Sequence, residues 1–558
     1  MPPAWRRAAE PAAAFVAVLA LMIATEPRLA IVWDEGYTLG REARVRGWLG
    51  KLRGQSDPPQ RPRYELVQLD NARAVVPPPP PTAGPFDHAR LLYSWPFGRE
   101  EPHGHPPFYA IVGMLGDLVA PGWEVLPRAR LGPMVAFSLA AAWIYSALRA
   151  RAGAWAAVAG ASTWALHPHL FAHGHYATVD AILASLWVIA VLAFARASGA
   201  DEPAEGRRSP DWAAAVVAGL AVGWAADTKL TGWFLPVPFL LWSLIPGPNR
   251  RRIALTWAVL LPVAALAFYA FNPPIWMAPV EGIARFLRSN LTRDKTIVIP
   301  VLFLGHVYET PRESLPWYNT LAWTLFATPV GMLAMGLVGC WRSLADRAVR
   351  GLGSLVLIHW LFLLALRALP NTPGHDGTRQ ILTAFGLLAI LAGLGAGWLA
   401  TRRWGRYLIV ASLVELAVSL AAFLPVPLSY YSPAIGGLPG AYSLGLEPTY
   451  FWDSLDSEAI AWLNANTPEG RGIAFATNPT SFMYLQRTGK LPAAITPEQT
   501  PSPAWFVLQN RPGEFREGHL RLIREGHPAY VGSKFGVPLI WVYPFDEASA
   551  LLRSGEGR

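Results

Sequence analysis

Long apolar runs separated by short polar segments are the main pattern along this chain. A helix that crosses the hydrocarbon core of a membrane needs about 17–25 such residues. The runs predict eleven spanning helices, at residues 11–31, 130–149, 154–172, 177–196, 211–227, 230–246, 253–272, 319–340, 352–369, 379–400 and 406–425. A further apolar run at 106–120 is short, contains Pro106, Pro107 and Asp117, and is followed by Pro121, so we expect it to lie on the membrane surface.

The polar remainder predicts two outer loops and a separate tail. Residues 32–129, with the stiff, extended stretch Pro77–Pro81, form the first loop, and residues 273–318 form the second. The tail, residues 427–558, predicts helices near 453–465, 480–488 and 514–525 and strands near 472–476, 505–509, 528–532 and 538–543. The expected fold is an all-α polytopic membrane bundle over residues 1–426, followed by a small extracytoplasmic α/β domain.

Basic residues give the orientation of the spans. If the N-terminus is cytoplasmic, arginines concentrate in the inner segments and are scarce in the short outer connections, which is the positive-inside pattern. The inner arginines are Arg6, Arg7, Arg149, Arg151, Arg196, Arg207, Arg208, Arg250, Arg251, Arg252, Arg342, Arg347, Arg350, Arg402, Arg403 and Arg406. The first run also has features of a signal peptide, but without a small-residue cleavage site before Trp33 we expect a retained anchor.

Composition supports a membrane protein and narrows its class. The 558 residues are 53% hydrophobic and only 15% charged, whereas soluble domains carry about 25% charged residues. Cys340 is the only cysteine, which excludes a disulfide scaffold. The net charge of +9 belongs to the membrane part, because the tail holds 10 basic and 12 acidic residues. We therefore expect no nucleic-acid partner, and the lack of a phosphate-binding glycine fingerprint disfavours an ATP-driven pump.

Ionisable residues near the outer ends of the predicted spans are the candidates for chemistry, because such groups are costly in lipid. They are Asp34, Glu35, His103, His105, His173, His175, Asp180, Lys229, His375, Asp376 and Arg379. A carboxylate can accept the proton of an acceptor hydroxyl, and lysine or arginine can stabilise a leaving phosphate. Together they fit group transfer from a lipid phosphate at the outer membrane surface.

Other interpretations remain open at this point. The Asp34-Glu35 pair could be a solvated start of a loop, and Lys229 could extend its amine to the interface. The histidines could be hydrogen-bonded interface residues, or His103 and His105 could bind zinc or another divalent ion, so a metal cofactor stays open. Asp227 and Lys229, which interrupt two spans, favour a transporter or lipid flippase, although we find no internal repeat. A third alternative is a non-catalytic component of polymer export.

Several motifs, in their order along the chain, resemble those of membrane-embedded C-type glycosyltransferases of family 39, the dolichyl-phosphate-mannose protein mannosyltransferases and aminoarabinose transferases. The resemblance covers about residues 15–450. The motifs are Asp34-Glu35-x-Tyr37, His105-Pro106-Pro107-Phe108-Tyr109, Thr178-Val179-Asp180, Thr228-Lys229-Leu230-Thr231-Gly232, Leu315-Pro316-Trp317-Tyr318, Gly377-Thr378-Arg379 and the stretch from Leu428 to Ala441.

This resemblance implies an inverting hexosyl- or pentosyltransferase of the plasma (inner) membrane that uses a polyprenyl-phosphate sugar. The acceptor would be a protein, a glycolipid or a cell-envelope polymer. Asp34, with Glu35 beside it, would be catalytic. The residues expected to bind donor or acceptor are Tyr37, His103, His105, His175, Asp180, Lys229, Trp317 and Arg379. The chain departs from the family pattern in its proline-rich first loop and in His103, and the resemblance gives the tail after about residue 445 no role.

Overall fold

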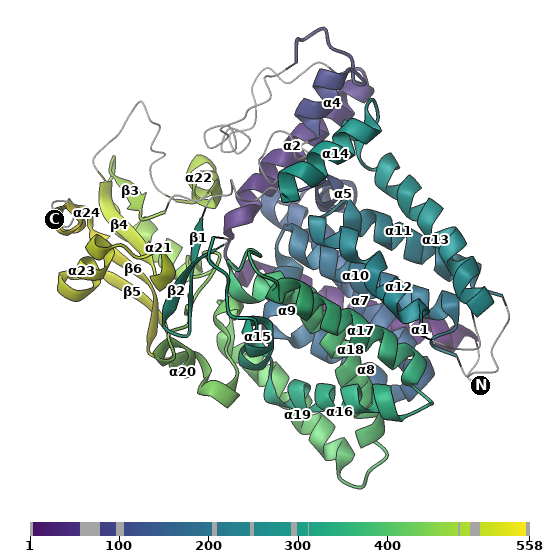
Figure 1. Cartoon of the computed structure of the whole chain (residues 1–558). Coiled ribbons are helices and arrows are strands. Elements are labelled where there is room, and N and C mark those ends of the chain that lie inside the picture. The colour runs from purple at the N-terminus through teal and green to yellow at the C-terminus, as the bar shows by residue number, and fades with distance from the viewer. Residues whose placement is uncertain are drawn as a thin grey trace.

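The computed structural model describes residues 4–55, 79–95, 105–202, 209–245, 250–291, 298–310, 312–477, 480–491 and 503–553. Figure 1 shows a large helical bundle, a mixed sheet built from the C-terminal part of the chain, and the hairpin β1–β2 between them. The expected fold class, a helical membrane bundle with a C-terminal α/β region, is confirmed.

Seven helices of the described residues are long and apolar enough to cross a membrane. The chain is therefore a multi-pass membrane protein. The seven are α1 (Ala4–Thr25), α7 (Val125–Ala152), α10 (Val179–Ser198), α13 (Arg250–Ala270), α17 (Arg350–Ala368), α18 (Leu382–Leu399) with the short helix η5 (Gly377–Ile381) before it, and α19 (Gly405–Phe423).

The other four predicted spans are helical, but each is either shorter than the seven or interrupted. Proline lacks an N–H and starts new helices more readily than it continues old ones. The breaks occur at Pro168, between α8 (Ala154–Leu166) and α9 (Pro168–His175), at Pro236, between η2 (Leu230–Phe234) and α12 (Pro236–Ser243), and at Pro329, between α15 (Asn319–Ala327) and α16 (Val330–Ala345). The fourth, α11 (Trp212–Ala226), is continuous but has only 15 residues.

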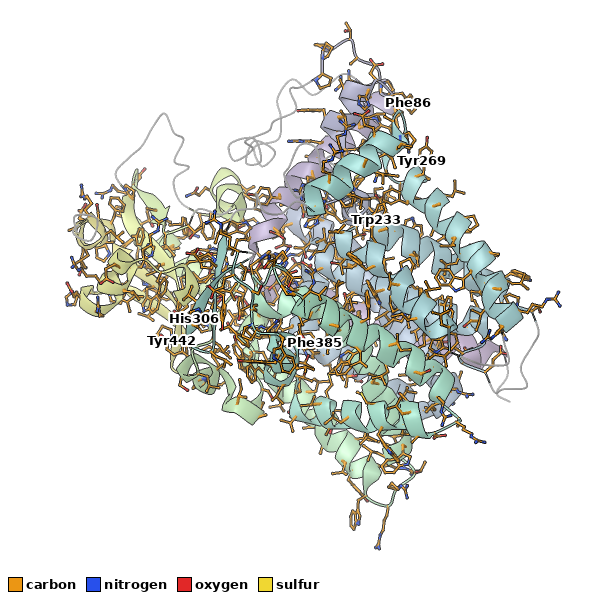
Figure 2. The ribbon with its side chains drawn as sticks, in the orientation of Figure 1. Phe86, Trp233, Tyr269, His306, Phe385 and Tyr442 are labelled. Atoms are coloured by element: carbon orange, nitrogen blue, oxygen red, sulfur yellow. The ribbon has the colours of Figure 1, made fainter. Side chains whose placement is uncertain are left out.

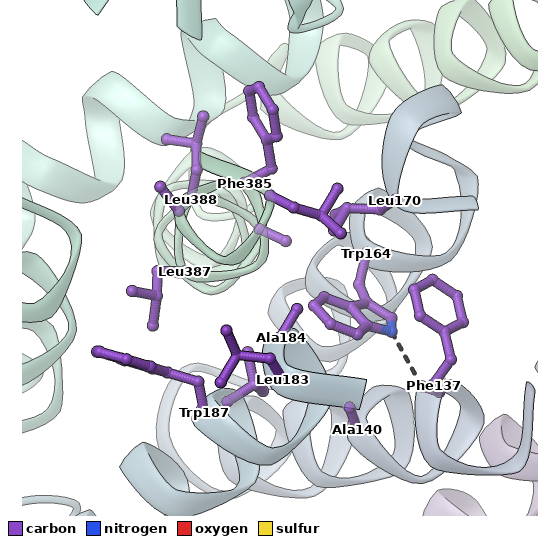
Figure 3. Packing of buried hydrophobic residues seen from close by; sticks show 14 of the residues in the cluster. Phe137, Ala140, Trp164, Leu170, Leu183, Ala184, Trp187, Phe385, Leu387 and Leu388 are labelled. Carbon is purple, nitrogen blue, oxygen red and sulfur yellow. Dashed lines mark hydrogen bonds between the residues drawn. The ribbon is translucent and has the colours of Figure 1, made fainter. Parts of the chain in front are cut away.

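The centre of the bundle is formed by α10 and α18, because 94% of the residues in the apolar stretch of each are buried. Figure 3 shows this packing around Trp164, whose ring stacks on Phe137 at 4.7 Å and whose Nε1 donates to the Phe137 carbonyl (3.0 Å). Glycines let the helices approach: a Cβ on Gly339 of α16 would lie 1.8 Å from the carbonyl oxygen of Leu391 on α18. Close contact at small residues is typical of helix packing in membranes.

After α1 and η1 (Glu26–Arg28), the first loop begins with a 20-residue helix, α2 (Trp33–Leu52), whose first turn contains Asp34 and Glu35. It continues with α4 (His88–Ser94), α5 (Phe108–Gly113) and α6 (Leu115–Val119), so the apolar run at 106–120 forms two short helices. The Phe108 N–H donates to the Asp227 carbonyl (3.1 Å), which fixes the start of α5 beside the Lys229 segment.

The second loop contains η3 (Pro273–Ile275), α14 (Pro279–Leu291) and the antiparallel hairpin β1 (Ile299–Phe303) and β2 (His306–Thr310). Its two turn residues, Leu304 and Gly305, both have positive φ, as a tight hairpin turn requires. The Gly305 N–H donates to the Gly445 carbonyl (2.9 Å), so the hairpin lies against the loop after α20 (Gly437–Ser443). Figure 2 labels His306 and Tyr442 at this junction.

The C-terminal part follows the predicted order of helices and strands closely. After η6 (Pro427–Ser429), η7 (Pro433–Ile435) and α20 come α21 (Ser457–Asn466), β3 (Gly472–Phe475), α22 (Thr480–Arg487), β4 (Pro503–Gln509), η8 (Pro512–Glu514), α23 (Glu517–Glu525), β5 (Tyr530–Lys534), β6 (Val537–Pro544) and α24 (Phe545–Arg553). The tail sheet has the order β3-β4-β6-β5, with only β3 and β4 parallel. One apolar cluster joins Leu39 of α2 to Trp452 and Phe482, so the tail sheet packs onto the first loop.

Candidate functional site

Four charged side chains gather around Arg379, and three of them contact its guanidinium directly. This charge cluster consists of Asp34, Asp180, Lys229, Asp376 and Arg379. Arg379 donates from Nε to Asp180 (2.6 Å), from Nη1 to Asp376 (3.0 Å), and from Nη2 to Asp34. Its guanidinium also lies over the Phe451 ring, 4.4 Å from the ring centre.

Lys229 completes the charge cluster through Asp180. The Lys229 amine donates to Asp180 Oδ1 at 2.7 Å, while Arg379 uses Oδ2, so Asp180 joins the two cations. Asp180 occupies the first turn of α10, where the helix dipole stabilises a negative charge. Lys229 lies in the break between α11 and η2, and its side chain reaches Asp180 at the N-terminal end of α10.

Local sequence explains the turn that presents Arg379. Asp376 and Gly377 both have left-handed backbone angles, with φ of 58° and 48°. Aspartate tolerates this conformation better than most residues, and glycine adopts it freely. A Cβ at Gly377 would also lie 2.9 Å from the Tyr450 hydroxyl. The Asp-Gly-x-Arg sequence is therefore suited to a tight turn that places the aspartate and the arginine together.

The carboxylates of the charge cluster differ in their environments. Asp34 is the most accessible, with 26% of its side chain exposed, against 3% for Asp180 and 9% for Asp376. Burial raises the pKa of Asp34 above its usual value, although Arg379 opposes this. Burial would also raise the pKa of Asp376, but Arg511, His375 and Arg379 outweigh it and lower that pKa to about 2. Asp34 is therefore the better proton acceptor of the two.

A cavity of about 1290 Å³ borders the charge cluster. Asp34, Asp376 and Arg379 line it from the bundle side. The hairpin and the tail sheet supply the opposite walls, with Ile299, Glu309, Phe506, Arg511 and Phe515 among the lining residues. This central cavity is large enough for an extended polar ligand.

The structure brings together part of the predicted site. Asp34, Asp180, Lys229 and Arg379 meet directly, and Tyr37 lines the central cavity. His105 lies close enough to the charge cluster for Lys229 and Arg41 to affect it: burial first, and then these cations, lower its pKa well below the usual value. A neutral His105 can accept a hydrogen bond but adds no charge.

Other predicted residues lie elsewhere. The Glu35 carboxylate is fully buried and accepts from Arg130 Nη2 (2.7 Å) and from the Ala177 N–H (2.9 Å). His175 hydrogen-bonds the carbonyls of Phe171 and Met22 and the hydroxyl of Thr25. Glu35 therefore connects α2 to α7, and His175 connects α9 to α1. Trp317 is 74% exposed and is not among the cavity-lining residues, and His103 lies outside the described residues.

Three residues at the site had no assigned role in the sequence interpretation: Asp376, Phe451 and Arg511. Asp376 was a candidate only because it lies at the outer end of a predicted span. It directly precedes the motif Gly377-Thr378-Arg379, and this position could have indicated its role. Arg511 belongs to the tail, and its Nη2 lies 3.2 Å from Asp376 Oδ1. No motif in the tail indicated a contact with the bundle.

The residues of the charge cluster do not suit a divalent metal ion. Asp34, Asp180 and Asp376 already face the cations Lys229 and Arg379, which occupy the positions that a metal would take. Within the described ranges, no three histidine, cysteine, aspartate or glutamate side chains gather as metal ligands would.

Asp227 and Lys229, the two residues that favoured a transporter, have different partners. The Asp227 carboxylate accepts from the side-chain amide of Asn272 (2.8 Å) and is fully buried. The interruption between α11 and η2 thus serves to present Lys229 to Asp180.

Residues 105–277 match the family described as dolichyl-phosphate-mannose-protein mannosyltransferase. The predicted family resemblance is confirmed for this segment. The segment contains the motifs of His105, Asp180 and Lys229. Comparison with curated protein sequences gives no match.

Among solved structures, this chain is similar to ArnT from Cupriavidus metallidurans. Both the apo structure and the structure bound to undecaprenyl phosphate show 15% identity and a TM-score of 0.49, and the comparison with the apo structure covers 96% of this chain and 98% of that one. The apo oligosaccharyltransferase from Archaeoglobus fulgidus shows 13% identity and a TM-score of 0.47, over 86% of this chain and 64% of that one.

Proposed function

We propose that this chain is a membrane glycosyltransferase that moves a sugar from a polyprenyl-phosphate donor to an acceptor hydroxyl or amine. The observation that carries the proposal is the arrangement around Arg379. A partly exposed carboxylate, Asp34, faces the central cavity, while the cations Lys229 and Arg379 lie beside it with Asp180. The match of residues 105–277 to a glycosyltransferase family supports this reading.

The chemistry assigns one role to each side of the charge cluster. Asp34 accepts the proton of the acceptor as its oxygen or nitrogen attacks the anomeric carbon of the sugar. The bond from that carbon to the phosphate oxygen breaks, and Lys229 and Arg379 stabilise the negative charge that remains on the polyprenyl phosphate. A single displacement of this kind inverts the anomeric centre, as expected for a hexosyl- or pentosyltransferase of this type.

The donor lipid requires an apolar groove next to the cations. Lys229, Arg367 and Arg379 line a narrow space on the bundle side of Asp180, together with Leu183 and Leu363. Its volume is only about 10 Å³, roughly one water molecule, so the helices must separate locally when a donor phosphate enters. The acceptor would then approach from the opposite side, through the central cavity.

Position in the membrane follows from the arginine pattern of the sequence. We infer a plasma-membrane enzyme with a cytoplasmic N-terminus, with the charge cluster and the tail sheet at the extracytoplasmic face. A protein, a glycolipid or a cell-envelope polymer would serve as the acceptor.

The test is transfer by the purified, lipid-reconstituted protein with a polyprenyl-phosphate sugar and a panel of these acceptors. Asp34→Asn should remove transfer while the thermal midpoint stays near that of the wild type. Asp546→Asn is the matched control, because Asp546 is exposed and is not among the residues that line the cavity, and this variant should transfer normally. Normal transfer by Asp34→Asn would refute the assignment. Movement of the donor lipid across vesicles, without sugar transfer, would instead support the transporter or flippase alternative.

A further inference from the structure

The tail sheet contributes a charged residue to the charge cluster across a long sequence distance. Arg511 follows β4 and is 8% exposed. Its Nη2 lies 3.2 Å from Asp376 Oδ1, and the other oxygen of Asp376 accepts from Arg379. Asp376 therefore connects an arginine of the tail to the arginine that touches Asp34 and Asp180.

Arg511 is held in place from several sides. The neighbouring residue Asn510 donates its N–H to the Leu539 carbonyl (2.8 Å) and its side-chain amide to the Pro538 carbonyl (2.7 Å). Nε of Arg511 lies 3.5 Å from Glu447, a fully buried carboxylate that also accepts from the Leu302 N–H of the hairpin. The end of β4 thus fixes the backbone, and Glu447 restrains the side chain.

The turn after Arg511 is packed too closely to move independently. A Cβ on Gly513 would lie 2.4 Å from Glu447 Oε1 and 3.0 Å from the Leu302 N–H nitrogen. The tail, the hairpin and the loop after α20 therefore pack against one another at this point. A shift of the tail here would move Arg511 relative to Asp376.

We infer that Arg511 is a positioning residue that acts through Asp376 to hold Arg379 in the orientation required for transfer. The tail sheet is then part of the catalytic apparatus, and a bundle without it would lack a correctly placed Arg379. The inference rests on the proposed function, and it adds a residue and a role for the tail that the family resemblance does not supply.

A double-substitution cycle tests this route. Arg511→Gln alone is expected to lower kcat by about 10- to 100-fold, since displacement of a reacting group by about 1 Å can cost 100-fold, with KM for the donor nearly unchanged. In an Asp376→Asn background, Arg511→Gln should cause little further loss, because residues that act in one chain of contacts are not additive. Arg511→Lys should recover part of the rate, since it restores the charge without the planar fork.

Matched controls and a second readout separate this inference from the proposed function. Arg524→Gln removes an exposed arginine of the tail that pairs with Glu517, and it should leave transfer unchanged. Equal transfer by Arg511→Gln and wild type would overturn the inference, as would fully additive losses or an effect confined to KM. If the wild type itself transfers no sugar, the proposed function fails. The same cycle measured on thermal midpoints then decides whether Arg511 and Asp376 are coupled, and the absence of coupling would overturn the positioning role as well.

Discussion

Replacing Glu35 by glutamine is expected to destabilise the protein while the molecules that remain folded still transfer sugar. Glu35 and Asp34 are adjacent in sequence, but they face different surroundings. Asp34 faces the central cavity, whereas Glu35 is fully buried against Arg130. Substituting each in turn therefore distinguishes a chemical role from a structural one.

The magnitude follows from the contacts of Glu35. Its carboxylate accepts from Arg130 Nε (2.8 Å) and Nη2 (2.7 Å) and from the N–H groups of Val32 (3.0 Å) and Ala177 (2.9 Å). Removing one partner of a buried ion pair costs about 3–5 kcal/mol. Glutamine keeps one acceptor oxygen, and Glu26 still lies 3.0 Å from Arg130, so we expect the lower end, about 3 kcal/mol. That is roughly a 100-fold change in the ratio of folded to unfolded protein.

The assay is thermal unfolding of the purified protein, with transfer measured on the same preparations at a temperature where both variants are folded. Glu124→Gln is a suitable control, because Glu124 is 67% exposed and its pairing with Lys490 should contribute at most about 1 kcal/mol. A Glu35→Gln variant with unchanged thermal stability and no transfer would refute the reasoning, since it would place Glu35 in the chemistry.

Two further predictions concern the charge cluster. With rising pH, kcat/KM should first increase as Asp34 loses its proton; burial raises the pKa of Asp34, so this increase should lie above the usual range for aspartate. It should then decrease as Lys229 loses its proton, because burial lowers the pKa of Lys229 to about 8 although Asp180 opposes this. A profile that stays flat above pH 8 would contradict the role of Lys229. Gly377→Ala should lower the free energy of unfolding by about 1–3 kcal/mol and reduce transfer, since φ is 48° and the new Cβ would lie 2.9 Å from the Tyr450 hydroxyl. The control is Gly470→Ala, where φ is also positive but the space is open. Unfolding and transfer are measured for both variants. Equal effects of the two substitutions on transfer would show that the clash does not displace Arg379.

The sequence was sufficient for features that depend on local patterns. Apolar period and turn residues predicted the strands near 505–509 and 538–543, which the structure shows as β4 and β6. The helical character of the four shorter spans was also predicted, but apolar composition does not reveal where a helix breaks. The breaks lie at Pro168, Pro236 and Pro329. Proline lacks the N–H that continues a helix, and a count of apolar residues does not take this into account.

The site was predictable where a charge stood out against an apolar background. Asp180, Lys229 and Arg379 could be named for this reason, and they do meet. Glu35 shows the limit of that reasoning, because a buried structural ion pair has the same sequence signature as a catalytic acid. Arg511 could not be named at all, since polar tails contain many arginines and only the tertiary packing selects one.

Asp34 and Arg379 are 345 positions apart, and Arg511 lies a further stretch beyond, in the last tenth of the chain. A ribosome that has completed half of this protein has therefore produced Asp34, Asp180 and Lys229, but not Asp376, Arg379 or Arg511. Long-range contacts of this kind form late, after domains that consist of local contacts. The helices of the growing chain would enter the membrane before the charge cluster is complete. The lipid-linked sugar could react only after the tail strands had been synthesised and had packed against the bundle.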